Sequence, residues 1–468
     1  MRIKTNVILW SSLGIYLFFY FLYYPKIYTI FDEACYLDLS YALRKCTVYL
    51  EKADIGTLHF PIKKGTHLVS LYPIGNSAFL VPFTFLKSKG LFLYGLLFHL
   101  LGYIIFIKVL KEAAISPKYA ILYLFYPPHL FFSRTLMSDI PSAFFALLAF
   151  YSYQKERYIR MGISLGLSFL IRYASLFLLP IFLIFILGKK SSVELSLRIR
   201  HSIKVLLGFL PFLLLVFFYN YIVYGAPFYT GYPTPRPIFE LHRYIAHLLF
   251  YLLSLSIFYP LMIVPPFFYK KAYRFEILIS FISIIFFYIL SSFAFSLYTE
   301  YSLKDWVKTS ILTVRYFFPI IPLLLIAYSS VCEKYLSNLF VPIWVLLIAI
   351  SIGIQHYHNQ YLNSQAEFKD SLYSHTTEHS IIIGNEEVTE LISNLWGKRT
   401  LVLWKEIDLS TLPKEDLWLA ILIRLDKPNT KLLELRDSVI TKFNTQLVKE
   451  ISRIDKKFEL YKLEQTNQ

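Results

Sequence analysis

Cysteine is scarce in this sequence, and its spacing carries no metal motif. The chain of 468 residues has three cysteines, Cys35, Cys46 and Cys332, and none belongs to a CxxC pair. A metal site built on cysteine is therefore not indicated. Cys35 and Cys46 share one predicted outer loop and could pair in an oxidising compartment. The spacing of His356 and His358 does not by itself make a zinc site.

The sequence also lacks a concentrated basic surface. Its formal net charge is +16, but Lys and Arg are spread over the predicted loops, without a patch or an aromatic platform. Nucleic-acid binding needs such a patch, so nucleic acid is not a predicted partner. Repeats and low-complexity tracts are absent too.

The first apolar run has no small-residue cleavage site. It covers Val7 to Tyr24 and follows only Arg2 and Lys4. We interpret it as a retained anchor rather than a signal peptide.

Long apolar runs are abundant. Hydrophobic residues make up 56% of the chain and aromatic residues 19%, with a mean hydropathy of +0.52. The runs predict an α-helical polytopic membrane protein with about 11 transmembrane helices in residues 1–355. The predicted spans are 7–24, 90–110, 117–133, 139–154, 158–171, 173–187, 203–223, 241–268, 275–297, 311–331 and 339–355.

The distribution of Lys and Arg orients these spans. With the amino terminus in the cytoplasm, the short inner segments carry 17 Lys and Arg. The outer segments carry seven, leaving aside the first long loop and the tail. Basic residues favour the cytoplasmic side, so the tail is predicted to be extracytoplasmic.

Residues 25–89 then form one long outer loop. Its stretch 68–86 is apolar but contains Pro73, Gly75, Asn76 and Pro82. Residues that interrupt a helix are unfavourable in a span exposed to lipid, so we expect a re-entrant or interfacial helix there.

The carboxylate pair Asp32-Glu33 lies seven residues after Pro25, at the mouth of the predicted membrane domain. Ionisable groups are costly near hydrocarbon, so a site there is a functional candidate. The alternative is an acidic helix start, where carboxylates complement the macrodipole.

Further polar residues fall on the same predicted outer side. The arrangement of two acidic loops with several cations suits an anionic, lipid-linked substrate. Asp139 could instead cap a helix, and Arg172 and Arg315 could reach lipid headgroups. Lys63 and Lys64 could be solvated loop residues. His242 and Arg243 could be interface anchors. The residues concerned are Tyr36, Lys63, Lys64, His67, Tyr72, Arg134, Asp139, Arg172, His242, Arg243, Arg315 and Tyr316.

Several short motifs resemble the GT-C glycosyltransferases, over about residues 20–355. They are closest to the branch of protein O-mannosyltransferases and aminoarabinose transferases. The motifs are Asp32-Glu33, Met137-Ser138-Asp139, Arg172 after Gly162 to Gly166, Asn220 to Pro227, and Arg315 to Pro322.

The resemblance implies sugar transfer from a polyprenyl-phosphate donor to a protein, lipid or glycan acceptor at the outer face of the membrane. It puts the family's first-loop catalytic carboxylate on Asp32 and its second-loop acidic residue on Asp139. It makes Lys63 or Lys64 the nearest equivalent of a lysine that contacts donor phosphate in some relatives. The chain departs there from the Lys-Pro-Pro-Leu pattern of those relatives.

The expected chemistry needs a base and positive charge. Asp32, with Glu33 beside it, would take the proton of the acceptor hydroxyl. Arg315, Arg172 or a lysine would stabilise the leaving phosphate, with Tyr316 nearby. No cofactor is required, although Asp32, Glu33 and Asp139 could bind a divalent metal.

The composition becomes more polar after Ile354. We predict a small extracytoplasmic α/β domain over 356–468, with strands at 380–384 and 417–423 and helices at 386–396 and 432–451. It shows no array of nucleophile and base, so a recognition or structural role is expected. The alternative function for the whole chain is a transporter or flippase of a lipid-linked or anionic substrate. A transporter should show mid-membrane polar residues, whereas here the charges lie at span ends.

Overall fold

The computed structural model describes residues 4–50, 62–64, 67–188, 194–231, 241–290, 310–392, 399–403, 416–425, 430–453 and 456–464. The chain divides into two compact units. We call residues 1–24, 73–79 and 92–356 the helical unit, and residues 25–72, 80–91 and 357–468 the sheet unit.

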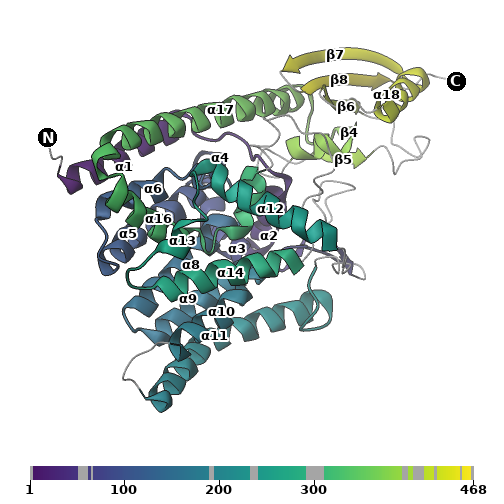
Figure 1. The fold of residues 1–468 in the computed structure, drawn as a ribbon. Helices are drawn as coiled ribbons and strands as arrows, with labels where there is room; N and C mark the ends of the chain where they lie inside the picture. Colours follow the sequence, from purple (N-terminus) through teal and green to yellow (C-terminus); the bar gives the residue numbers. More distant parts are fainter. Residues whose placement is uncertain are drawn as a thin grey trace. The chain divides into compact units, whose positions relative to one another are not determined.

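Helices build the helical unit, and Figure 1 shows α8, α9, α10 and α11 as neighbours. Most of their residues are apolar, as expected for helices surrounded by lipid and other helices. The longer helices are α1 (Thr5–Leu22), α5 (Leu93–Glu112), α8 (Asp139–Gln154), α9 (Tyr158–Ile171), α10 (Leu178–Leu187), α11 (Leu195–Tyr224), α12 (Leu241–Phe258), α14 (Arg274–Leu290), α16 (Ile321–Tyr335) and α17 (Phe340–His375), whose residues from 357 on belong to the sheet unit.

Three predicted spans are broken at prolines. Residues 117–133 form η1 (Pro117–Ala120), α6 (Ile121–Leu124) and α7 (Pro127–Phe132). Residues 241–268 divide into α12 and α13 (Pro265–Phe268). Helical residues 310–317, which end in η3 (Arg315–Phe317), meet α16 at an angle of 98°. Proline lacks the amide hydrogen and clashes with the preceding turn, so each break falls next to one.

Four described helices are long and apolar enough to cross a membrane, or five if the bent pair counts as one span. All eleven predicted spans contain helix in the described residues, but most of these helices are shorter than the roughly 20 residues that a span needs. A mostly helical membrane fold with a C-terminal sheet is therefore confirmed, while the number of eleven spans stays a prediction. The segment predicted to be re-entrant forms α3 (Ile74–Thr84), followed by α4 (Lys87–Gly90).

Two glycines allow α9 and α11 to approach each other closely. A Cβ at Gly162 would lie 2.1 Å from the Val205 carbonyl oxygen, and one at Gly208 would lie 2.4 Å from the Ile159 carbonyl oxygen. Small residues at helix crossings are a common packing device in membranes.

We expect Gly162→Ala to destabilise the protein by about 1–3 kcal/mol, because the backbones would have to separate. Thermal unfolding in detergent measures this, with Gly353→Ala in α17 as the matched control, since no described residue lies within 4 Å of a Cβ there. Equal unfolding midpoints for the two variants would contradict the close crossing.

The amino-terminal part of the sheet unit holds α2 (Phe31–Arg44) and a three-stranded sheet of order β1-β3-β2. The strands are β1 (Tyr49–Leu50), β2 (Ile62–Lys64) and β3 (His67–Val69), and both pairings are antiparallel. Leu39, Ala42 and Leu50 form a small apolar core between α2 and β1.

The C-terminal part is a five-stranded mixed sheet of order β5-β4-β6-β8-β7. The first three strands in that order are parallel, and β8 and β7 are antiparallel additions. The strands are β4 (Ile381–Gly384), β5 (Thr400–Leu403), β6 (Leu417–Arg424), β7 (Asn444–Arg453) and β8 (Lys456–Glu464), with η5 (Glu386–Leu391) and α18 (Thr430–Lys442) between them.

The helix predicted over 432–451 is wrong in its second half. α18 ends at Lys442, and Asn444–Arg453 is a strand that pairs with β8. Thr445, Val448 and Ile451 favour a strand once a partner is present, and Ile451 joins the buried core. The segment predicted as a helix at 386–396 is a 3₁₀-helix up to Leu391, and its residues 393–396 lie outside the described part.

Candidate active site

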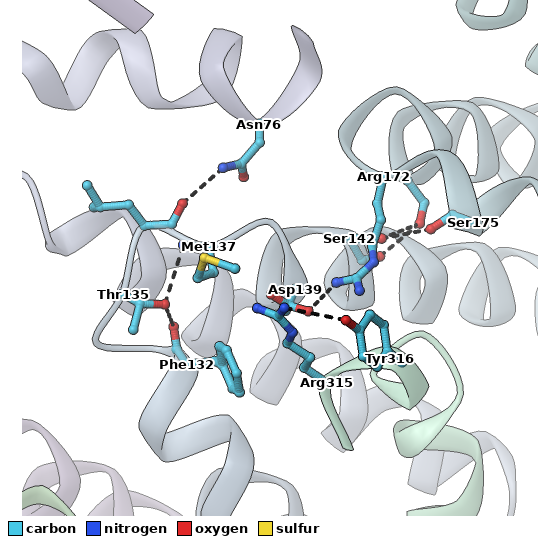
Figure 2. A network of polar contacts seen from close by, with 12 residues as sticks. Asn76, Phe132, Thr135, Met137, Asp139, Ser142, Arg172, Ser175, Arg315 and Tyr316 are labelled. Atoms are coloured by element: carbon cyan, nitrogen blue, oxygen red, sulfur yellow. Dashed lines mark hydrogen bonds and ion pairs between the residues drawn. The ribbon is translucent and has the colours of Figure 1, made fainter. Parts of the chain in front are cut away.

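An ion pair between Asp139 and Arg172 is the centre of the polar cluster in the helical unit (Figure 2). Asp139 is the first residue of α8 and is 1% exposed, and Arg172 is the residue that follows α9. Arg172 Nη1 donates to Asp139 Oδ1. Asp139 Oδ2 is buried without a hydrogen-bond partner among the described residues. Asp139 is thus buried and has one oxygen left to accept a bond, while the Arg172 side chain is 14% exposed.

Arg315 and Tyr316 complete this cluster from η3. The guanidinium carbons of Arg172 and Arg315 each lie 5.3 Å from the centre of the Tyr316 ring. Arg315 Nη2 lies 3.5 Å from the Tyr316 hydroxyl. Figure 2 shows both arginine side chains pointing toward Asp139. Two cations beside one carboxylate leave a net positive charge, which favours an anion.

Three serines fix the backbone that carries Arg172. The Ser142 hydroxyl lies 3.0 Å from that of Ser168 and 2.8 Å from that of Ser175. The Arg172 amide donates to the Ser168 carbonyl, and its own carbonyl accepts from the Ser175 amide. These bonds join α8, α9 and η2 (Tyr173–Phe177) around the arginine.

Asn76 holds the loop that leads into Asp139. Its amide nitrogen donates to the Leu136 carbonyl over 2.9 Å, and its side-chain oxygen accepts from the Tyr94 hydroxyl over 2.6 Å. Glycine is required nearby, since a Cβ at Gly95 would lie 2.5 Å from the Ser133 carbonyl oxygen. The loop is therefore held by α3 and α5.

The motif from Asn220 to Pro227 forms the end of α11 beside the same cluster. Gly225 has a φ of 90°, the left-handed conformation that glycine provides after a helix. The Asn220 side chain donates to the Pro227 carbonyl over 3.1 Å and accepts from the Tyr173 hydroxyl over 2.9 Å. Since Tyr173 follows Arg172 directly, this motif supports the arginine.

Arg134 is buried and packs against the end of α1. It is fully buried, Nη2 donates to the Tyr23 carbonyl, and the guanidinium lies 5.7 Å from the centre of the Tyr20 ring. These contacts tie the loop to α1. The structure does not place Arg134 among the groups that surround Tyr316.

We expect the ion pair to contribute measurably to stability. The variants Asp139→Asn and Arg172→Gln, alone and combined, form a double-mutant cycle read by thermal unfolding. Because each single change leaves one buried partner uncompensated, the coupling energy should be about 1–3 kcal/mol. Strictly additive losses would contradict the pairing.

In the sheet unit, Asp32 and Glu33 lie in the first turn of α2 but in different environments. Glu33 is fully buried, and its Oε1 accepts from the backbone amides of Thr29 and Ile30 over 2.8 and 2.9 Å. Asp32 is half-buried. Glu33 thus caps the helix, which is the alternative that the sequence left open, and the roles predicted for Asp32 and Glu33 in the chemistry stay predictions.

The other predicted substrate residues of the sheet unit pack on aromatic neighbours. Tyr36 and Tyr72 are buried with ring centres 4.7 Å apart, and the exposed His67 stacks on Tyr49 at 4.4 Å. The backbone of Lys63 and Lys64 lies in β2, with Lys64 opposite His67. The side chains of Lys63, Lys64, His242 and Arg243 lie outside the described residues.

The disulfide that the sequence left open is not formed. Cys35 is a buried thiol and Cys46 an exposed one. The ten residues Cys35–Arg44 extend along α2 for about 13 Å, which is too far for a disulfide. Burial, and then the nearby Asp38 and Asp32 carboxylates, raises the pKa of the Cys35 thiol well above its ordinary value. In the described part of the chain, no three His, Cys, Asp or Glu residues are grouped to hold a metal ion.

The fold is similar to that of ArnT, a protein with the GT-C fold. Two crystal structures of ArnT from Cupriavidus metallidurans show this. The apo structure matches with a TM-score of 0.56 at 10% identity, covering 97% of both chains. The structure bound to undecaprenyl phosphate matches with a TM-score of 0.61 at 9% identity, covering 98% of both chains. No protein-family model matches the sequence, and no curated protein does. The fold predicted from the short motifs is thus confirmed.

Proposed function

We propose that this protein is an integral-membrane glycosyltransferase that moves a sugar from a polyprenyl-phosphate donor to an acceptor. The observation that supports this best is the cluster of Arg172, Arg315, Tyr316 and Asp139 in a chain with the GT-C fold. One solved protein of this fold is bound to undecaprenyl phosphate, the class of lipid phosphate proposed as the leaving group. The site of action is the outer face of the cell's inner or plasma membrane, with the amino terminus in the cytoplasm.

In the proposed reaction the acceptor hydroxyl attacks the anomeric carbon of the donor sugar. Asp32 takes the hydroxyl proton as the new C–O bond forms, and the bond from the sugar to the phosphate oxygen breaks. Polyprenyl phosphate leaves with the bonding electron pair. Arg172 and Arg315 stabilise its negative charge, and preorganised charge of this kind is often the largest catalytic contribution.

The ion pair with Asp139 prepares Arg172 for this role. A guanidinium that is held by a buried carboxylate, on a backbone fixed by the serine cluster, does not have to be ordered when the phosphate arrives. Both guanidiniums also lie over the Tyr316 ring, and this cation–π contact helps to hold them in place. Fixed donors lose little conformational entropy on binding, so more of the binding energy serves the transition state.

The test is transfer by the purified full-length protein in lipid nanodiscs. Polyprenyl-phosphate sugars of several kinds are supplied with an extract of cell-envelope acceptors, and products are identified by mass spectrometry. Surface glycans and lipid-linked sugars from cells with and without the gene give the acceptor class. Sugar transfer with release of polyprenyl phosphate is expected. Movement of intact lipid-linked substrate between leaflets, without bond cleavage, would instead establish a flippase.

A further inference from the structure

A short strap before α2, residues Ile27–Thr29, is docked on the C-terminal part of the sheet unit. Ile27 is 1% exposed and belongs to the apolar core that contains Leu362, Phe368 and Phe458. The Tyr28 hydroxyl donates to the Ile392 carbonyl over 3.1 Å. The Thr29 hydroxyl and His358 Nε2 are 2.7 Å apart, and His358 is 2% exposed. Three consecutive residues thus contact segments more than 300 positions further along the chain.

The same strap holds the start of α2. The amides of Thr29 and Ile30 both donate to Glu33 Oε1, and the Glu33 amide donates back to the Ile30 carbonyl over 3.0 Å. Asp32 lies inside this closed turn, one residue before Glu33. A shift of the strap would therefore move the Asp32 backbone directly.

The alternative is that these contacts only stabilise the C-terminal fold. Ile27 serves that purpose, since it fills an apolar core. The Tyr28 and Thr29 hydroxyls do not fill the core; each makes a directional bond to one atom of the C-terminal segment. Such bonds fix where the strap lies rather than whether the domain folds.

We infer that the C-terminal part of the sheet unit, residues 357–468, is a positioning element for Asp32. It acts through Tyr28, Thr29 and the Glu33 cap. This inference rests on the proposed function, because it needs Asp32 to take part in transfer. The C-terminal region then has a defined role, which is to hold the base in the geometry that proton transfer requires. Small displacements are sufficient to matter, since about 1 Å of misplacement can cost 10²-fold in rate.

Substitutions of Glu33 distinguish a positioning role of this residue from a catalytic one. Glutamine has an amide oxygen in place of Oε1 and can accept the same two backbone bonds without a charge. Glu33→Gln should keep kcat near that of the wild type, whereas Glu33→Ala should lower it about 10- to 100-fold, because the α2 turn loses its cap.

The strap is tested by the double variant Tyr28→Phe/Thr29→Val, which removes two hydroxyls and keeps both shapes. In the nanodisc transfer assay we expect kcat to fall about tenfold or more. The KM for the lipid donor should stay unchanged, and the unfolding midpoint should fall by a few degrees at most, so that the variant stays folded at the assay temperature. Thr441→Val on α18 is the matched control, because among the described residues its hydroxyl bonds only to the α18 carbonyls of Asp437 and Ser438.

Each contrary result would contradict a different claim. A Glu33→Gln variant as inactive as Glu33→Ala would show that the charge is needed and would overturn the cap's positioning role. Wild-type kcat in the double variant would overturn the role of the strap, and so would a fall in kcat no larger than the fraction of the variant that is unfolded at the assay temperature. A wild-type protein that transfers no sugar would overturn the proposed function instead.

Discussion

Arg315→Met should lower kcat for sugar transfer about 10²–10³-fold, with a smaller change in the KM for the donor. The reason is that negative charge on the leaving phosphate grows as the bond to the sugar breaks, so a preorganised cation acts mainly on the transition state. Methionine keeps length and apolar packing against Tyr316 while it removes the charge. Steady-state kinetics with a polyprenyl-phosphate sugar in nanodiscs measures both constants.

A second variant, Arg315→Lys, separates the effect of the positive charge from that of the planar guanidinium. Lysine restores the positive charge but not the planar guanidinium on Tyr316, so its kcat should lie between those of the wild type and Arg315→Met. Arg200→Met on the exposed start of α11 is the matched control and should have the kcat of the wild type. Equal kcat for Arg315→Met and Arg200→Met would remove Arg315 from the proposed reaction.

The helical architecture could be predicted because its signal is long and redundant. Each apolar run contains many residues that agree, so hydropathy located most of the longer described helices of the helical unit to within a few positions. Breaks inside the runs were harder to predict. Pro127, Pro265 and Pro319 lie at interruptions that an average over a window conceals.

The charged members of the cluster were identified one by one, but their pairing was not. Asp139 and Arg172 are 33 residues apart, and nothing in their local sequence says that one faces the other. Only the crossing of α8 and α9 brings them together. The serines that fix this crossing, Ser142, Ser168 and Ser175, are small and polar inside apolar runs, which was the available signal.

Glu33 shows that two adjacent carboxylates can lie in different environments. Its neighbour Asp32 differs by one position, yet a helix rotates by about 100° per residue, so the two side chains leave in different directions. Glu33 turns back to its own first turn and is fully buried. The pattern of a carboxylate three positions after a helix start predicts such a cap.

The C-terminal sheet shows a different limit. Residues 444–451 have helix-compatible spacing, and the sequence signal alone favoured one long helix over 432–451. Pairing with β8 decides the matter, because a ladder of backbone hydrogen bonds needs a partner that local sequence does not show.

Asp32→Asn should lower kcat for transfer about 10²–10⁴-fold, the usual contribution of a general base. Asparagine keeps the size of the side chain and its acceptor oxygen, so α2 and its Glu33 cap should remain and the unfolding midpoint should not change. The lipid donor should bind with an unaltered KM, since the proposed phosphate ligands are Arg172 and Arg315. Asp370→Asn, an exposed carboxylate paired with Lys369, is the matched control and should transfer at the wild-type rate. Full transfer by Asp32→Asn would show that another group removes the acceptor proton, and the phosphate cluster would then have to be tested with a different base in mind.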